Sequence, residues 1–367
     1  MKNILITPEG IKKNLKNVKP LDAICEYIWN GFDAGASHVR VYLHTNEMGL
    51  INMVSIIDDG TGIVYDELPH KFQPFNESKK ADLPSRLNHS LPHGRKGIGR
   101  LTFFSFAQIA RWDTVYEKNE KKYKYYIGMN KDSLNEYDDN GGLKPTETKD
   151  SVGTKVTFTQ LIALSKEEII EEIRNEFFWF LELNESNKYE ISVDDQLISY
   201  EDIVINRTEL DLVQLKLNHE YEVKFVQWSK SLGKEYSKFY FIGSDNKECY
   251  KEATKLNKKS DEFFHSIFIK SSYFDEFNFD NTQIEGQIGL FPNKNESEFK
   301  ILIDAINRYL IKFRKEYLKE ASDKYIDALI KKEVYPNFNM SNFIDIYRKR
   351  ELDNLVETLY TAQPKIF

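Results

Sequence analysis

The alternation of hydrophobic and polar residues predicts that the first half of the chain mixes helices with strands. Residues 21–34, LDAICEYIWNGFDA, are apolar around most of a helical circumference and predict a buried helix. Asp22 is the candidate N-cap of this helix, and Gly35 follows its end. Period-two alternation predicts strands in the runs 39–44, 51–58, 108–116, 122–129 and 152–160.

The second half of the chain has a different pattern. Residues 166–183 predict a helix, and residues 186–290 read as mixed strands and turns. From 297 to 334 apolar residues recur at helical spacing with Lys and Arg between them, and Pro336 ends that pattern. A further helix is expected over 341–361. The basic face of the long helix is typical of a solvated face, although a dimer or partner surface has the same pattern.

Composition narrows the class of protein. The 367 residues carry a net charge of −7 and are 41% hydrophobic, which excludes a fully disordered chain. No run approaches the roughly 18 consecutive apolar residues of a membrane span, and the N-terminus lacks the apolar core of a secretory signal. Cys25 and Cys249 form no metal-binding spacing, so we expect a protein of the reducing cytoplasm. The acidic balance disfavours a dedicated duplex-DNA binder, although a local basic patch could still bind DNA.

A polar stripe runs along the buried helix expected at 21–34. Glu26, Asn30 and Asp33 are spaced i, i+4 and i+7 and therefore share one face. Because buried carboxylates and amides without partners are costly, this stripe needs a partner or a ligand if it is buried. The alternative, equally supported by this helix alone, is that the stripe is the wet side of an amphipathic helix.

Two glycine-rich segments could bring the backbone close to a ligand. The segment 56–63, IIDDGTGI, ends an apolar strand with two acids and then places Gly60 and Gly62. The segment 93–100, HGRKGIGR, spaces Gly94, Gly97 and Gly99 ahead of an apolar run that we expect to be helical. A helix that starts with free N–H groups suits phosphate, but each motif alone also occurs in ordinary turns.

Four motifs in order resemble the signature of the GHKL ATPases, which include gyrase B, the ninety-kilodalton heat-shock chaperone, histidine kinases and MutL. They are EYIWNGFDAGA, DDGTG, GRKGIG and the GT of residues 152–156. The first motif looks most like MutL, and NESKK (76–80) is similar to a Ser-x-Lys feature of MORC-type members. The resemblance implies an α+β protein. We expect a Bergerat-fold α/β sandwich (1–165), a transducer-like α/β domain (166–296) and C-terminal helices (297–367).

The same resemblance implies ATP and Mg²⁺ as ligands. Glu26 would be the general base, Asn30 the protein ligand of Mg²⁺, and Asp58 the acceptor for the adenine amino group. Asp59 stands where many relatives have Asn, which we interpret as a departure of little consequence. Residues 73–96 would form a lid over the phosphates. The other positions that the resemblance assigns to the nucleotide are Asp33, Gly60, Gly62, Lys79, Gly94, Lys96, Gly97, Ile98, Gly99 and Thr154.

The resemblance implies an ATP-gated clamp that hydrolyses ATP slowly and forms a nucleotide-dependent homodimer. Its client would be a protein or DNA, by analogy in anti-phage defence or DNA metabolism. The alternative is a nucleotide-sensing module that does not hydrolyse ATP. A histidine kinase fits poorly, because residues 1–20 contain no phosphoacceptor His. No Gln-Thr-Lys string is present; Lys230 and Lys234 are candidates for a lysine from the following domain, although solvated loop lysines are more common.

Overall fold

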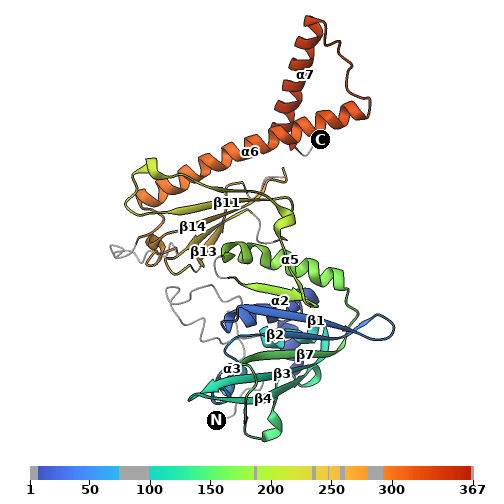
Figure 1. Ribbon diagram of the computed structural model, residues 1–367, viewed down its shortest axis with the longest axis vertical. Coiled ribbons are helices and arrows are strands. Elements are labelled where there is room, and N and C mark those ends of the chain that lie inside the picture. Colours follow the sequence, from blue (N-terminus) through green and yellow to red (C-terminus); the bar gives the residue numbers. More distant parts are fainter. Residues whose placement is uncertain are drawn as a thin grey trace. The chain divides into compact units, whose positions relative to one another are not determined.

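The computed structural model of this protein is described over residues 7–73, 99–185, 188–233, 237–246, 248–256, 261–279 and 292–364. The chain divides into two compact units, Met1–Asp202 and Ile203–Phe367. The expected boundary at residue 165 falls inside the first of these units, so the functional segments 1–165, 166–296 and 297–367 remain a proposal. Each unit contains its own sheet (Figure 1), and the α+β class predicted from the sequence is confirmed.

Unit 1 is built on a nine-stranded sheet with the order β5-β4-β3-β7-β2-β1-β8-β9, and β6 pairs with β4. Its strands are β1 (His38–Thr45), β2 (Ile51–Asp58), β3 (Ala107–Lys118), β4 (Lys121–Asn130), β5 (Asp138–Asp139), β6 (Thr146–Thr148), β7 (Gly153–Leu161), β8 (Glu190–Val193) and β9 (Gln196–Leu197). All neighbouring strands are antiparallel except β1 and β8. The pairing of β8 with β1 brings residues 190–193 into the first sheet.

The helices of unit 1 are α1 (Pro8–Asn14), α2 (Pro20–Asp33), α3 (Leu68–Phe72) and α5 (Lys166–Leu183). Helix α2 begins one residue earlier than the sequence suggested, because Pro20 takes its first turn and the Lys19 backbone is the N-cap. Asp22 is therefore a first-turn acid and not the N-cap. The Trp29 ring of α2 packs on Phe177 of α5, which buries the apolar faces of both helices.

The glycine cluster ahead of residue 100 leads into a different structure from the expected helix. Residues Gly99–Ser105 form a 3-10 helix, η2, and the chain then enters β3 at Ala107. The apolar side chains of Leu101, Phe103 and Phe106 are buried. The expectation of an α-helix was wrong, because the apolar run is divided between a short 3-10 helix and the start of β3.

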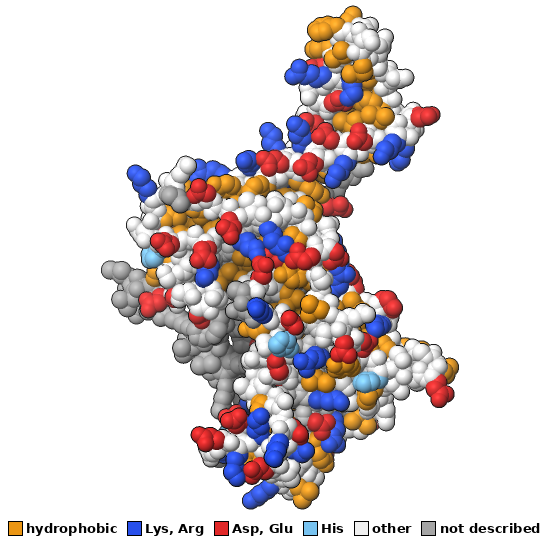
Figure 2. All heavy atoms as spheres, viewed as in Figure 1, with side chains coloured by type: hydrophobic (Ala, Val, Ile, Leu, Met, Phe, Trp, Pro, Cys, Tyr) orange, Lys and Arg blue, Asp and Glu red, His pale blue; other side chains and the backbone are white. Residues whose placement is uncertain are grey.

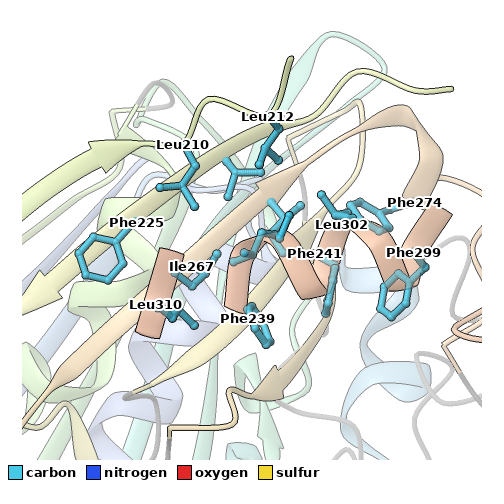
Figure 3. Packing of buried hydrophobic residues seen from close by; sticks show 14 of the residues in the cluster. Leu210, Leu212, Phe225, Phe239, Phe241, Ile267, Phe274, Phe299, Leu302 and Leu310 are labelled. Atoms are coloured by element: carbon cyan, nitrogen blue, oxygen red, sulfur yellow. The ribbon is translucent and has the colours of Figure 1, made fainter. Parts of the chain in front are cut away.

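Unit 2 packs one long helix on a five-stranded sheet of order β10-β11-β14-β12-β13. The elements are β10 (Val204–Glu209), β11 (Glu222–Trp228), β12 (Lys238–Ile242), β13 (Glu248–Ala253), β14 (Phe264–Lys270), α6 (Ser297–Lys331) and α7 (Phe343–Ala362). Figure 3 shows Leu302 and Leu310 of α6 among side chains of the sheet such as Phe225, Phe241 and Ile267. This aromatic-rich layer is the core of unit 2.

Beyond the sheet, α6 continues and the chain returns as α7, with no buried residue in α7. The two helices contact each other through Tyr325 and Tyr360, whose ring centroids are 6.1 Å apart. Among the residues that the structure describes, no helix is both long and apolar enough to cross a membrane.

Candidate active site

Asp58 stands at the last position of β2, where a central strand of the first sheet ends. Its Oδ1 accepts hydrogen bonds from the backbone N–H of Gly60 (3.0 Å) and of Thr154 (3.3 Å). Within the described part of the chain these are its hydrogen bonds, so Oδ2 is left to accept from a ligand. Burial raises the pKa of Asp58 to about 6, against the two backbone bonds that lower it.

Glycines let the backbone close tightly around this carboxylate. Gly62 has φ of +70°, and a Cβ there would lie 2.1 Å from the carbonyl oxygen of Val115. Gly153 precedes Thr154, and a Cβ on it would lie 2.2 Å from the carbonyl oxygen of Asp58. These two positions accept only glycine without a backbone shift. The sequence motif D-x-G-x-G therefore reflects a steric requirement of this corner of the sheet.

Two threonines lie next to Asp58 at the same end of the sheet. Thr114 of β3 and Thr154 of β7 are buried register partners, and their hydroxyl oxygens lie 3.1 Å apart. The Thr114 hydroxyl also accepts from the backbone N–H of Ile63 at 2.9 Å. Sequence reasoning selected Thr154 and missed Thr114, because only the register of β3 against β7 brings the two hydroxyls together.

The polar stripe on α2 leads from this corner toward the start of η2. Asn30 and Asp33 are exposed, and Glu26 is half-buried. Gly99 lies against Glu26, since a Cβ at Gly99 would come within 2.6 Å of the glutamate Oε1. Gly31, about 100° around the helix from Asn30, packs on Asp58, with its built Cβ 3.0 Å from the Asp58 Cβ. The structure thus brings the α2 motif, Asp58 and Gly99 together.

Arg100 links the residues that flank segment 74–98 to each other and to α2. Segment 74–98 itself lies outside the described residues. The guanidinium Nη2 of Arg100 donates to the carbonyl oxygen of Phe72 at 2.8 Å. The hydroxyl of Tyr27, on α2, donates to the carbonyl oxygen of Arg100 at 2.8 Å. These contacts fix where residue 99 meets α2. Sequence reasoning assigned no role to Arg100 or Tyr27, because neither has a ligand-binding pattern.

Asp59 has a structural role that the sequence analysis underrated. Its carboxylate accepts from the backbone N–H groups of Ser37 (2.8 Å) and His38 (2.9 Å) and lies 2.7 Å from His38 Nδ1. Partial burial acts to raise the pKa of Asp59, but these hydrogen bonds outweigh burial and the pKa is lowered. Asp59 therefore holds the turn between α2 and β1, which fixes the helix relative to the strand that ends in Asp58.

Several residues assigned from the sequence cannot be placed. Lys79, Gly94, Lys96, Gly97, Ile98 and Lys234 lie outside the described residues. Lys230 is described, but it belongs to unit 2. Among the described residues, no group of three or more His, Cys, Asp or Glu side chains could hold a metal ion by itself. A site for Mg²⁺ here would need the oxygens of a phosphate ligand in addition to the Asn30 amide.

Comparison with known proteins gives a family for most of the segment that carries the candidate site. Residues 18–154 match the family described as histidine kinase-, DNA gyrase B-, and HSP90-like ATPase. This segment, which holds α2, Asp58 and Thr154, is a GHKL-type ATP-binding domain with a Bergerat-like arrangement of sheet and helices. The family predicted from the four motifs is confirmed.

Two curated relatives are similar to part of the chain. The chain is 38% identical over 91 residues to a putative MutL protein homolog 1 from Schizosaccharomyces pombe, which covers 25% of this chain and 13% of that protein. It is 44% identical over 62 residues to the DNA mismatch repair protein MutL of Thermus aquaticus, covering 17% of this chain and 11% of that protein. The match thus spans only about an eighth of these relatives.

Among solved structures, the chain is similar to the Aquifex aeolicus MutL ATPase domain complexed with ADP. The identity is 13% and the TM-score 0.36, over 69% of this chain and 92% of that one. The family assignment rests on the matched segment 18–154 and not on this low score.

The residues present fit an adenine nucleotide. A partly buried carboxylate with one oxygen left for a ligand suits the exocyclic amino group of adenine, which is a donor. Beside it, the backbone at Gly62 leaves no room for a side chain. The amide oxygen of the exposed Asn30 is a hard oxygen donor of the kind that Mg²⁺ takes alongside phosphates and water.

Proposed function

We propose that unit 1 binds Mg²⁺-ATP and hydrolyses it slowly. The observation that carries this proposal is Asp58, whose Oδ1 is held by two backbone N–H groups while Oδ2 is left for a donor. Asp58 accepts from the adenine amino group, and Gly62 lies beneath the ring. The hydroxyl of Thr154, held by Thr114, orients a water that shares the recognition of adenine.

The α2 stripe supplies the chemistry at the other end of the nucleotide. Asn30 contributes its amide oxygen to Mg²⁺, which when bound neutralises phosphate charge. Glu26 stands one helical turn before Asn30 and accepts the proton of the water that attacks the γ-phosphorus. Gly99 lies against Glu26, so the backbone after the glycine cluster closes on the base without a side chain between them. Asp33 supports the nucleotide-facing end of the helix.

Slow turnover follows from the position of the base. Glu26 is only half-buried, so the chain must first close around the phosphates and exclude bulk solvent, leaving only the attacking water beside Glu26. Lys79, Lys96 and the glycines at 94 and 97 would complete that closure. We propose that closure is coupled to formation of a homodimer, which makes the protein an ATP-gated clamp. A protein or DNA client, and a place in anti-phage defence or DNA metabolism, remain predictions.

Substitution of Glu26 by Ala tests the proposed base. We expect ATP binding to survive and turnover to fall by about 100-fold or more, because the proton acceptor is lost. Phosphate release measures turnover, and calorimetry with a non-hydrolysable analogue measures binding. Glu47→Ala is the matched control, since Glu47 is exposed in the turn at the far end of the β1–β2 hairpin.

Three outcomes separate the alternatives. Equal turnover in Glu26→Ala and wild type contradicts the role of Glu26. Wild-type protein that binds the nucleotide and never releases phosphate favours the nucleotide-sensing module instead. Sedimentation with and without the analogue and Mg²⁺ tests the clamp, because a nucleotide-gated clamp dimerises more tightly when the nucleotide is bound.

A further inference from the structure

Helix α7 of unit 2 carries an exposed stripe that the nucleotide chemistry does not use. Ile344, Arg348, Glu351 and Leu355 are spaced i, i+4, i+7 and i+11, which places them within about 60° of helical arc. All four are exposed, with Ile344 and Leu355 exposed by 57% and 54%. We call these four residues the α7 stripe. Figure 2 shows hydrophobic side chains along α7 among charged ones.

The α7 stripe lies away from the face that contacts the rest of unit 2. The face of α7 that meets the rest of unit 2 includes Asp353, which accepts from the hydroxyl of Tyr335 in the α6–α7 connection. Within α7, Asp353 also accepts from Lys349 at 2.6 Å. Tyr360 of the same face meets Tyr325 of α6. At 100° per residue this face is nearly half a turn from the stripe. The α6 contacts therefore leave the stripe uncovered.

The stripe is symmetric in hydrophobicity and antisymmetric in charge. Its two ends are aliphatic, and its middle has a base followed by an acid. When two copies of α7 pair antiparallel about a two-fold axis between residues 349 and 350, Ile344 faces Leu355 of the other copy. Arg348 then faces Glu351 of the other copy, and symmetry forms that ion pair twice. A parallel pairing in register would instead set Arg348 against Arg348.

Arg348 is available for such a contact. Its nearest acidic group on the same helix is Asp345, at 3.7 Å, and its side chain remains 69% exposed. Tyr347 and Leu359 flank the stripe and are 58% and 49% exposed, so they extend the apolar contact on both sides of the ion pairs. A surface for an unrelated partner has no reason to be complementary to itself, whereas a two-fold contact requires it.

We propose that α7 is an antiparallel self-association surface that joins two copies of this chain without nucleotide. The contact buries one helix face per copy, which places it among the small interfaces of transient complexes. This proposal is independent of ATP hydrolysis. In the proposed clamp, dimerisation through unit 1 requires nucleotide, whereas dimerisation through α7 does not.

Charge reversal tests the α7 contact on the full chain in the absence of nucleotide. Sedimentation equilibrium over a series up to about 100 µM gives the dimer dissociation constant. We expect Arg348→Glu, and separately Glu351→Arg, to weaken dimerisation by about tenfold or more, because each sets like charges opposite one another twice. The double variant Arg348→Glu/Glu351→Arg restores opposite charges and should return the dissociation constant close to wild type.

Arg350→Glu is the matched control, because Arg350 is exposed on the same helix but lies off both the stripe and the α6-facing side. It should leave dimerisation unchanged. A wild-type chain that stays monomeric without nucleotide overturns the proposal. Single reversals that have no effect, or a double variant as weak as the singles, overturn it as well.

Cysteine pairing tests the antiparallel direction. An equal mixture of chains carrying Ile344→Cys and chains carrying Leu355→Cys should form an interchain disulfide on oxidation. Either variant alone should not, because two copies of residue 344 would stand about 17 Å apart along the axis. Crosslinking of Ile344→Cys with itself, without a mixed disulfide between residues 344 and 355 in the mixture, would show a parallel contact and overturn the proposal.

Discussion

Two carboxylates, Asp58 of unit 1 and Glu298 of unit 2, differ in whether their hydrogen bonds outweigh the effect of burial on the pKa. Glu298 is buried in the first turn of α6, and its oxygens accept from Asn218 Nδ2, His219 N–H and the Tyr221 hydroxyl at 2.9–3.0 Å. Its Oε1 also lies 3.0 Å from His219 Nδ1. Burial alone would raise the pKa of Glu298, but these hydrogen bonds outweigh it and the pKa is lowered.

Asp58 shows the reverse balance. It receives two hydrogen bonds, both on Oδ1, and burial raises its pKa to about 6. A carboxylate whose oxygens are saturated by its own chain stabilises the fold, as Glu298 does. A buried carboxylate left partly unsatisfied lowers stability and is retained where a ligand supplies the missing donor. The comparison distinguishes an acid whose hydrogen bonds are supplied by its own chain from one that, in the proposed function, accepts from a ligand.

Removal of Glu298 should have the largest effect on stability. Glu298→Ala leaves the donors on residues 218, 219 and 221 without their shared acceptor, so we expect unit 2 to lose about 3 kcal/mol. Hydrogen–deuterium exchange at increasing urea concentration follows unit 2 separately from unit 1. ATP affinity should not change. Glu316→Ala is the control, since Glu316 is exposed on α6 and should cost under about 0.5 kcal/mol. Equal losses in the two variants would contradict the structural role of Glu298.

Substitution of Asp58 should affect binding and not stability. In Asp58→Asn the side-chain oxygen can still accept from Gly60 and Thr154, but the amide NH₂ cannot accept from adenine. We expect ATP affinity measured by calorimetry to fall by about 1–3 kcal/mol, with the free energy of unfolding kept or slightly raised.

Asp59→Asn provides the matched control for Asp58→Asn. It removes the negative charge that Ser37 and His38 contact, so it should lower stability while ATP affinity stays close to wild type. If Asp58→Asn binds ATP as tightly as the wild type, the assignment of Asp58 to adenine is wrong.

The raised pKa of Asp58 gives the smallest of the expected effects. Because the carboxylate must be ionised to accept from adenine, binding is intact above the pKa of about 6 and is lost as the pH falls through it. Between pH 7 and pH 5 we expect the part of the affinity that depends on Asp58 to fall by about tenfold. Titration of the nucleotide phosphates also contributes, and Asp58→Asn measures that contribution alone. Identical pH profiles in the two proteins would refute the prediction.

Much of the site could be predicted from the sequence because it is encoded locally. The stripe Glu26, Asn30 and Asp33 follows from helical spacing alone, and the D-x-G-x-G motif follows from one tight turn at a strand end. Thr114, Arg100 and Tyr27 could not be found in this way. Their roles depend on strand register and on contacts across 73 residues for Tyr27 and Arg100.

The fold shows the same division. The α+β class, the helix at 166–183 and the family of residues 18–154 could be predicted from the sequence alone, since periodicity and motif order are properties of short segments. The long helix was predicted over 297–334, and it ends three residues earlier, at Lys331. The pairing of β8 with β1, the hold of Asp59 on the turn after α2, and the saturation of Glu298 but not of Asp58 become visible only in the folded chain. The reason is physical: a side chain's hydrogen-bond partners and its burial depend on residues far apart in the chain, and no local pattern contains them.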